Sequence, residues 1–239
     1  MIALNERQYR HLITALRRGH GDRIEWFDGA GRFGDGLLEG SDRGGFGISI
    51  TSSADSAVES PDRCTLLLGI PKADALDQCL ALATQTGVGS IRLVIAERTA
   101  WRIIQEKRAR LLERWSQTII DSAEQCGRLT VPTLSMGTLD SELKALPPDA
   151  ILRVAMEPVD QFQPEGAATR GVSAERTAIA IGPEGGWSLA EQHLLASHGG
   201  ESWTIPGVTL TTVAACGILS ALWRWGRDSA DTSAPHTRW

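Results

Sequence analysis

The sequence has few cysteines and no long apolar run. Its four cysteines, Cys64, Cys79, Cys126 and Cys216, are widely separated and form no Cys-x-x-Cys pair. This spacing argues against a disulfide framework, and we expect no bound metal. No run of about 18 apolar residues is present, and the N-terminus lacks the apolar core of a signal peptide. We therefore expect a cytoplasmic protein with no membrane partner.

An excess of positive charge is also missing. The formal net charge is -5 at pH 7 and the pI is about 5.6, so a nucleic-acid partner would need a local basic patch. The first 18 residues offer one, and the segment 98–128 offers another. Their basic residues include Arg7, Arg10, Arg17 and Arg18 in the first and Arg102, Lys107, Arg108, Arg110 and Arg114 in the second. Composition alone favours solvated helix faces for both.

The most informative segment is a glycine-rich turn that follows a short apolar strand. Residues 177–181 are apolar and β-branched, which is typical of a strand in the middle of a parallel sheet. Gly182-Pro183-Glu184-Gly185-Gly186 comes next, and Ser188 with Glu191 forms a capping box that predicts a helix. Ligands of open α/β sheets bind at such turns, and glycines let them lie against the backbone.

This turn does not have the spacing of the common phosphate-binding loops. It contains neither Gly-x-Gly-x-x-Gly nor Gly-Lys-Ser/Thr. Glu184 further disfavours an anionic ligand and tolerates a cationic one. The plain alternative is a tight connection between strand and helix. Trp187 either stacks on a base or on adenine, or packs the helix start against the core.

Two domains are predicted from the change of pattern along the chain. A helix over 5–18 and strands over 23–27, 33–38 and 46–51 indicate a small β-barrel in residues 1–60, with 52–62 as a linker. Residues 61–228 alternate strands and helices, which predicts an α/β fold with a parallel sheet covered on both faces. Its expected strands are 64–70, 91–96, 150–155, 178–181 and 202–205, and its helices 72–86, 101–125, 138–145, 188–198 and 211–226. The segment 158–174 reads as a loop, and the polar end, from 227 and fully in 229–239, as a flexible tail.

The helix predicted at 211–226 is apolar almost all round. Such a helix is usually buried on two sides, so we expect a homodimer through it. The alternative is a central core helix within one chain.

The chain resembles the bacterial small-subunit rRNA methyltransferases that methylate N3 of a uridine in 16S rRNA, members of the SPOUT superfamily. The strongest shared motifs are 181–186 with Ser188 and Glu191, and Glu124-Gln125-Cys126-Gly127-Arg128 followed by Pro132. Weaker ones are His11-Leu12, Phe27-Asp28-Gly29, Gly87-Val88 and Glu97-Arg98-Thr99. The resemblance covers His11 to about Gly226.

The resemblance implies a PUA-like RNA-binding barrel in 1–60 and a trefoil-knotted, dimeric SPOUT domain in 61–228. It implies that S-adenosylmethionine binds between three loops, and that ribosomal RNA or the small ribosomal subunit is the partner. By position, the cofactor residues are Met156, Glu157, Ile181, Gly182, Pro183, Glu184, Gly185, Gly186, Ile205, Gly207 and Leu210. The RNA-binding residues would be Arg7, Arg10, Arg17 and Arg18.

One segment departs from the family pattern. Where relatives carry Leu-Gly-Pro-Arg-Ile/Val-Leu-Arg-x-Glu-Thr-Ala, residues 205–215 have Val208, Thr211 and Val213 at the charged positions. Methylation of uridine N3 removes a proton, and a nearby cation stabilises the anion. Three explanations are open. A different cation, Lys72, Arg98 or Arg128, has replaced the missing ones; the acceptor is another group; or the protein binds cofactor or RNA without transferring methyl.

Overall fold

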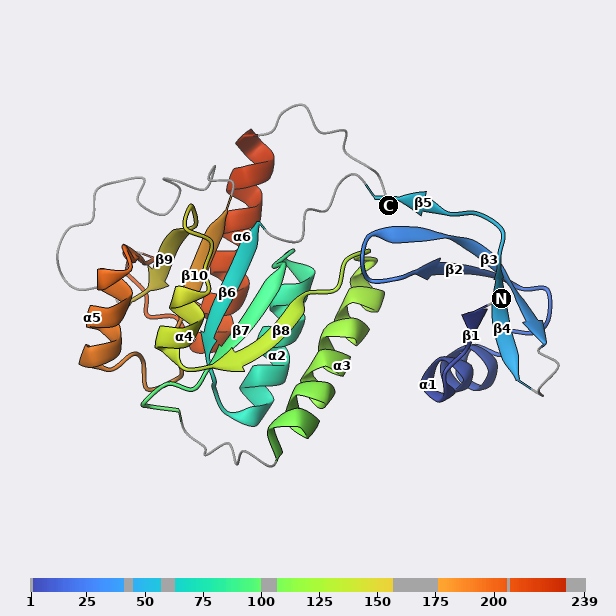
Figure 1. The fold of residues 1–239 in the computed structure, drawn as a ribbon, viewed down its shortest axis with the longest axis horizontal. Coiled ribbons are helices and arrows are strands. Elements are labelled where there is room, and N and C mark those ends of the chain that lie inside the picture. Colours follow the sequence, from blue (N-terminus) through green and yellow to red (C-terminus); the bar gives the residue numbers. More distant parts are fainter. Residues whose placement is uncertain are drawn as a thin grey trace. The chain divides into compact units, whose positions relative to one another are not determined.

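The computed structural model describes residues 2–40, 45–56, 63–99, 107–156, 176–205 and 207–230. The chain splits into two compact units, Met1–Glu59 with Arg128–Thr130, and Ser60–Gly127 with Val131–Trp239 (Figure 1). The short segment Arg128–Thr130 joins the first unit through backbone pairing, because the Gly31 N–H donates to the Leu129 carbonyl at 3.2 Å. No sequence pattern had indicated that residues 128–130 belong to the first unit.

The N-terminal unit is an antiparallel sheet with a small core. Its strands are β1 (Ile2–Ala3), β2 (Arg23–Phe27), β3 (Arg32–Gly40), β4 (Phe46–Ile50) and β5 (Ala54–Asp55). They pair in the order β1-β4-β3-β2, with β5 on β3. Ile24, Leu38 and Ile48 form the core. The predicted strands 23–27, 33–38 and 46–51 are confirmed, while the pairings among described residues form an open path rather than the closed ring of a barrel.

The predicted helix over 5–18 forms in two parts. Helix α1 (Glu6–Tyr9) begins with a capping box from Asn5 and Gln8 and continues as the π-helix η1 (Arg10–Ala15). Arg17 then adopts a left-handed backbone with φ of 53°. This is the position after a helix end that glycine usually occupies, so an arginine there carries backbone strain.

The C-terminal unit is a six-stranded parallel sheet. Its strands are β6 (Cys64–Gly69), β7 (Ser90–Val94), β8 (Thr133–Gly137), β9 (Ile151–Ala155), β10 (Thr177–Ile181) and β11 (Glu201–Trp203), in the order β11-β9-β10-β6-β7-β8. Every strand pair in it is parallel. The helices are α2 (Ala73–Gln85), α3 (Arg108–Cys126), α4 (Leu139–Lys144), α5 (Leu189–Ser197) and α6 (Thr212–Ala230). This confirms the predicted α/β class and parallel sheet.

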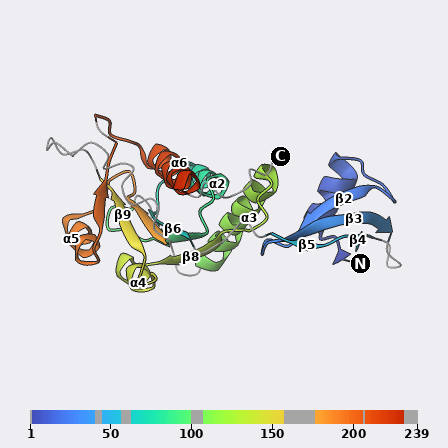
Figure 2. The same cartoon turned by 90° about the horizontal axis from the view of Figure 1, so that it is seen from above.

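Helices cover both faces of this sheet. Figure 2 shows α2, α3 and α6 on one side and α4 and α5 on the other. Side chains alternate along a strand. Leu66 and Leu68 of β6 therefore pack into the hydrophobic core on one face of the sheet, while Leu67 packs into the core on the other face. Strands β6 and β10 are buried along their whole length, which explains their continuous apolar sequences.

Three parts of the sequence interpretation need correction. Strand β8 was not predicted, because Thr133–Gly137 is an edge strand with few apolar residues. Strand β5 lies inside the predicted linker 52–62. Helix α6 extends to Ala230, beyond the predicted end at 226, so the polar tail does not begin at 227. The expected loop 158–174, the helix start 101–106 and the tail residues 231–239 lie outside the described residues.

Candidate functional site

Three segments predicted to bind the cofactor follow neighbouring strands at one edge of the sheet. Strand β9 pairs in parallel with both β10 and β11, so the carboxyl ends of all three strands point to the same edge. Met156 follows β9, Gly182–Gly186 follows β10, and Ile205 with Gly207–Leu210 follows β11. The structure therefore brings these segments to the edge where α/β proteins bind ligands. Glu157 lies outside the described residues.

The Gly182–Gly186 turn is held tightly at its base and is exposed at its tip. The Gly186 N–H donates to the Pro183 carbonyl at 2.8 Å, and Gly186 has a left-handed φ of 67°. Pro183 is buried against Gly69 at the end of β6, where an added Cβ would lie 2.5 Å from Pro183 Cδ. Glu184 and Gly185 are exposed. Backbone at the tip is thus accessible to a ligand.

Glu184 also caps a helix from outside it. Its Oε1 accepts the backbone N–H of Lys72 at 3.0 Å, and Lys72 is the N-cap residue of α2. In a capping box this N–H is satisfied by a Glu or Gln three residues further on, but the residue there is Ala75. Glu184 takes that role across 112 residues of sequence. Its negative charge is fixed beside the turn.

Arg98 contacts the same turn from the loop after β7. Its Nη1 donates to the Gly185 carbonyl at 2.9 Å, and its Cβ lies 3.1 Å from where a Gly185 Cβ would be. The side chain is exposed apart from this contact. Arg98 therefore presents a guanidinium at the edge of the predicted cofactor site, with one N–H fixed on the turn.

The predicted capping box of α5 is confirmed and connects two loops. The Glu191 N–H donates to Ser188 Oγ at 3.3 Å, and the Ser188 N–H donates to Glu191 Oε2 at 2.8 Å. The other carboxylate oxygen, Oε1, accepts the Glu97 N–H at 2.8 Å. Glu191 thus joins the start of α5 to the loop that carries Arg98.

Thr212, which the sequence analysis had not singled out, lies just after the third segment and holds the turn in place. It is the first residue of α6 and is buried, and its Oγ1 donates to the Gly182 carbonyl at 3.1 Å. Ile205 and Leu210 pack partly against the larger core, whereas Val208 is exposed. A hydroxyl at the start of an apolar helix was the only sequence signal for this contact.

The structure gives the surroundings of two residues that were considered for the site. Trp187 is 3% exposed and belongs to the core under α4 and α5, which supports packing rather than stacking on a base. Arg128 is buried and lies between the end of α3 and the start of β8, where the strand enters the sheet. Lys72 and Arg98 are the two candidate cations whose residues are hydrogen-bonded to the Gly182–Gly186 turn.

Within the described parts of the chain, no group of three or more His, Cys, Asp and Glu is arranged to hold a metal ion. No described helix is both long and apolar enough to cross a membrane. Cys64, Cys79 and Cys216 are buried and form no disulfide. A hydrogen bond with Cys79 and burial raise the pKa of the Cys216 thiol, so it stays protonated.

Comparisons with known proteins identify the family of the chain. Residues 58–224 match the family described as RNA methyltransferase domain, so the chain belongs to that family. This confirms the methyltransferase class predicted from the sequence. The chain is 24% identical over 228 residues to the ribosomal RNA small subunit methyltransferase E of Synechocystis, an alignment covering 92% of this chain and 73% of the relative.

Two solved structures share the fold across both units. The Neisseria gonorrhoeae ribosomal RNA small subunit methyltransferase E, bound to S-adenosyl methionine, has 26% identity and a TM-score of 0.79, covering 92% of this chain and 89% of that one. A Legionella pneumophila methyltransferase in complex with the same cofactor has 27% identity and a TM-score of 0.79, covering 92% and 90%.

Proposed function

We propose that this protein transfers a methyl group from S-adenosylmethionine to N3 of a uridine in 16S rRNA of the small ribosomal subunit. The family and the relative from Synechocystis support rRNA of the small subunit as the substrate class. The observation that carries the proposal is the Gly182–Gly186 turn, fixed by Thr212 and Arg98 among the ends of three parallel strands. Two relatives with this fold bind the same cofactor.

The residues present suit a cofactor that carries a positive charge. When bound, S-adenosylmethionine supplies the methyl group from a sulfonium. The turn offers backbone groups and the fixed carboxylate of Glu184, and the third segment offers the apolar Ile205 and Leu210 for an uncharged ring. The proposed cofactor residues are Met156, Glu157, Ile181, Gly182, Pro183, Glu184, Gly185, Gly186, Ile205, Gly207 and Leu210.

Arg98 is the proposed replacement for the family's missing arginines. Stabilisation of a developing anion is most effective when the cation is already held in place. Arg98 is hydrogen-bonded to the turn, whereas no described residue pairs with the ammonium of Lys72, which is exposed. Arg98 would bind the uridine as N3 loses its proton.

The order of the strands favours the knotted topology of the family. Strand β10 lies between β9 and β6, and β11, which follows it in the sequence, lies on the other side of β9. It next enters α6, which packs on α2 and β10. From this strand order we propose that the domain has the trefoil knot of the family. The antiparallel N-terminal unit is proposed to be the PUA-like domain.

Neutralising the exposed arginines at the end of the first helix should weaken rRNA binding. Arg10 is paired with Glu6, but the described residues provide no ion partner for Arg17 or Arg18. The variant to test is Arg17→Gly with Arg18→Ala. Glycine is chosen at position 17 because it adopts the left-handed backbone there without strain. We expect weaker rRNA binding and a salt slope smaller by roughly 0.7 to 0.9 for each phosphate that the variant no longer neutralises, measured by filter binding at several salt concentrations.

Arg17→Lys with Arg18→Lys is the matched control, because it keeps both charges. It should keep most of the salt slope. An unchanged affinity and slope in the neutralised variant would exclude these arginines from the RNA interface.

A homodimer through α6 is proposed from its second apolar face. Ala215, Cys216, Leu219 and Trp223 are buried within the chain, whereas Ile218 is 41% exposed and Trp225 76% exposed. These two residues are seven apart and lie on one side of the helix. Ile218→Glu with Trp225→Glu should convert a dimer to a monomer in sedimentation equilibrium without loss of helix signal. A wild-type monomer, or a variant that remains a dimer, would contradict this interface.

Calorimetry with S-adenosylmethionine and S-adenosylhomocysteine tests the cofactor assignment, and both should bind below millimolar concentration. A catalytically impaired protein, or one with another acceptor, is the second candidate, because Val208, Thr211 and Val213 carry no charge. Binding of the cofactor without methyl transfer to any of a panel of RNAs would favour it.

A further inference from the structure

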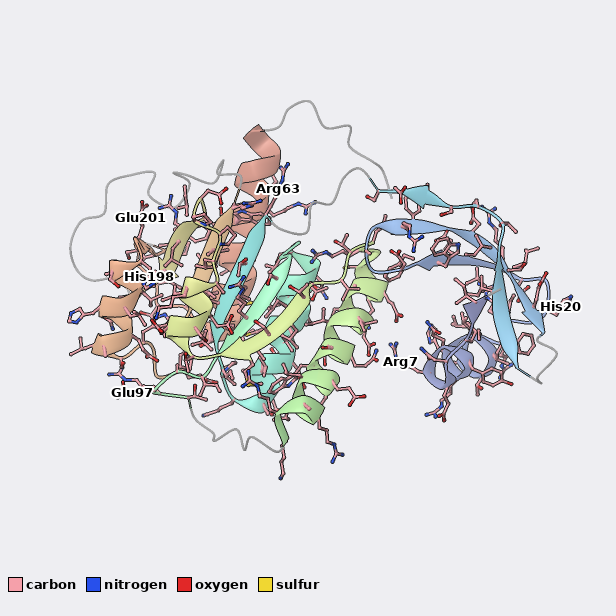
Figure 3. The ribbon with its side chains drawn as sticks, viewed as in Figure 1. Arg7, His20, Arg63, Glu97, His198 and Glu201 are labelled. Atoms are coloured by element: carbon pink, nitrogen blue, oxygen red, sulfur yellow. The ribbon has the colours of Figure 1, made fainter. Side chains whose placement is uncertain are left out.

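A second concave site lies at the end of the sheet opposite the Gly182–Gly186 turn. Figure 3 labels Arg63, just before β6, and Glu97, after β7, at these two ends. The second site is a cavity of about 280 Å³ on the face that carries α4. We call it the hydroxyl–arginine cavity. The described residues that line it are Thr65, Ser90, Arg92, Thr133, Pro147 and Arg176.

The three hydroxyl side chains named in the lining form a row across neighbouring strands. Thr65 of β6 is in register with Ser90 of β7, and Ser90 is in register with Thr133 of β8. Adjacent strands are about 4.8 Å apart, so consecutive hydroxyls can contact one small ligand. Thr133 Oγ1 donates to Ser90 Oγ at 3.0 Å. Thr65 is only 8% exposed, and its hydroxyl has no hydrogen-bond partner among the described residues.

The charged groups in the lining are both arginines, and each is held in place. Arg92 donates from Nη1 to the Glu142 carbonyl at 3.0 Å and from Nη2 to the Ala145 carbonyl at 3.3 Å. Arg176 donates from Nη1 to the carboxylate of Asp149 at 3.0 Å. Neither Glu142 nor Asp149 lines the cavity. A ligand there would meet hydroxyl groups and two guanidinium groups, each of which also pairs with a carboxylate outside the lining, Arg92 with Glu142 Oε2 at 3.9 Å and Arg176 with Asp149 Oδ1 at 3.0 Å.

We propose that the hydroxyl–arginine cavity binds a phosphate-type oxyanion. Hydroxyl and guanidinium donors are the groups that bind phosphate oxygens in proteins, and each bound oxygen would satisfy a donor that faces the cavity. Arg176 uses only Nη1 in its bonds to Asp149, so Nε and Nη2 can bind the ligand. The oxyanion is either free phosphate or a phosphodiester of RNA, and the second source rests on the proposed rRNA substrate.

Titration of the full chain with inorganic phosphate, followed by amide chemical shifts, tests this directly. Shifts should cluster at residues 65, 90, 133 and 176. Arg176→Ala and Thr65→Val should each weaken phosphate binding about tenfold, as expected for loss of a hydrogen bond to a charged group. Thr65→Ser keeps the hydroxyl and should bind phosphate like the wild type.

Arg63→Ala is the charge-matched control, because Arg63 is exposed at the same end of the sheet and does not line the cavity. It should leave phosphate binding unchanged. Unfolding temperature and S-adenosylmethionine affinity check that each variant is folded. Phosphate binding that is equal in wild type, Arg176→Ala and Thr65→Val, or shifts confined to other residues, would overturn the proposal.

Filter binding with small-subunit rRNA distinguishes the two possible ligands, free phosphate and a phosphodiester of RNA. If the site takes an RNA phosphodiester, Arg176→Ala and Thr65→Val should weaken rRNA binding while Arg63→Ala does so less. If rRNA affinity is unchanged while phosphate binding falls, the ligand is free phosphate. The phosphate titration does not depend on methyl transfer, so failure of the proposed enzyme activity would leave its result interpretable.

Discussion

Replacing Gly69 by alanine is expected to lower methyl transfer about 100-fold, the typical effect of shifting a positioning group by about 1 Å. A Cβ at this position would lie 2.5 Å from Pro183 Cδ and 2.8 Å from Pro183 N. Both atoms belong to the base of the Gly182–Gly186 turn, so the turn has to move. The affinity for S-adenosylmethionine, measured by calorimetry, should fall together with the rate of labelled methyl transfer.

Gly186→Ala is the matched comparison on the same turn. Apart from its two chain neighbours, none of the described residues lies within 4 Å of the added Cβ, but the left-handed φ of 67° is strained for alanine. That conformation costs about 1 to 2 kcal/mol for an alanine, so this variant should lose some stability and much less activity. If Gly69→Ala binds cofactor and transfers methyl as the wild type does, the Gly182–Gly186 turn is not part of the cofactor site.

Replacing Arg98 by alanine is the second change expected to have a large effect. We expect kcat to fall about 100- to 1000-fold, as happens when one stabilising donor is removed from an active site. Arg98 is proposed to stabilise the anion that forms at uridine N3. The change in kcat should therefore exceed the change in cofactor affinity, although loss of the bond to Gly185 will also loosen the turn.

Two further variants separate charge from structure in this test. Arg98→Lys keeps a cation, so its kcat should lie between those of Arg98→Ala and the wild type. Its kcat should come closer to the wild-type value at high pH, where the uridine ionises more readily. Lys72→Ala removes the second candidate cation and should lower kcat much less. Wild-type kcat in Arg98→Ala together with a large loss in Lys72→Ala would assign the cation to Lys72 instead.

The Gly182–Gly186 turn could be predicted from sequence because its signals are local. Residues 177–191 contain a buried strand, a proline, three glycines and a capping box, and each acts within a few residues. The structure contains the same strand and helix. The parallel sheet was predictable for the same reason, since its strands and helices alternate with clear apolar patterns.

The contacts that fix the turn could not be predicted, because they join distant parts of the chain. Glu184 bonds to Lys72 across 112 residues and Arg98 to Gly185 across 87. Sequence patterns do not show which loops meet once the strand order places β10 beside β6. Strand β8 was missed for a different reason, since an edge strand needs few apolar residues to be stable.

The position of Arg128 illustrates the same limit. Its motif places it after a helix and before a strand, but not at which edge of the sheet the strand begins. The topology puts that point at the amino ends of the strands, away from the turn. The structure shows hydrogen bonds to the turn from the residues of two candidate cations, Lys72 and Arg98.

The most direct test of the proposed activity is incubation of the protein with labelled S-adenosylmethionine and small ribosomal subunits that lack the modification. Nucleosides from the purified 16S rRNA are then separated and identified by mass spectrometry. The proposal predicts label in 3-methyluridine, with none when Arg98→Ala replaces the wild type at equal concentration and short times. Label in another nucleoside, or cofactor binding with no label in rRNA, would contradict it.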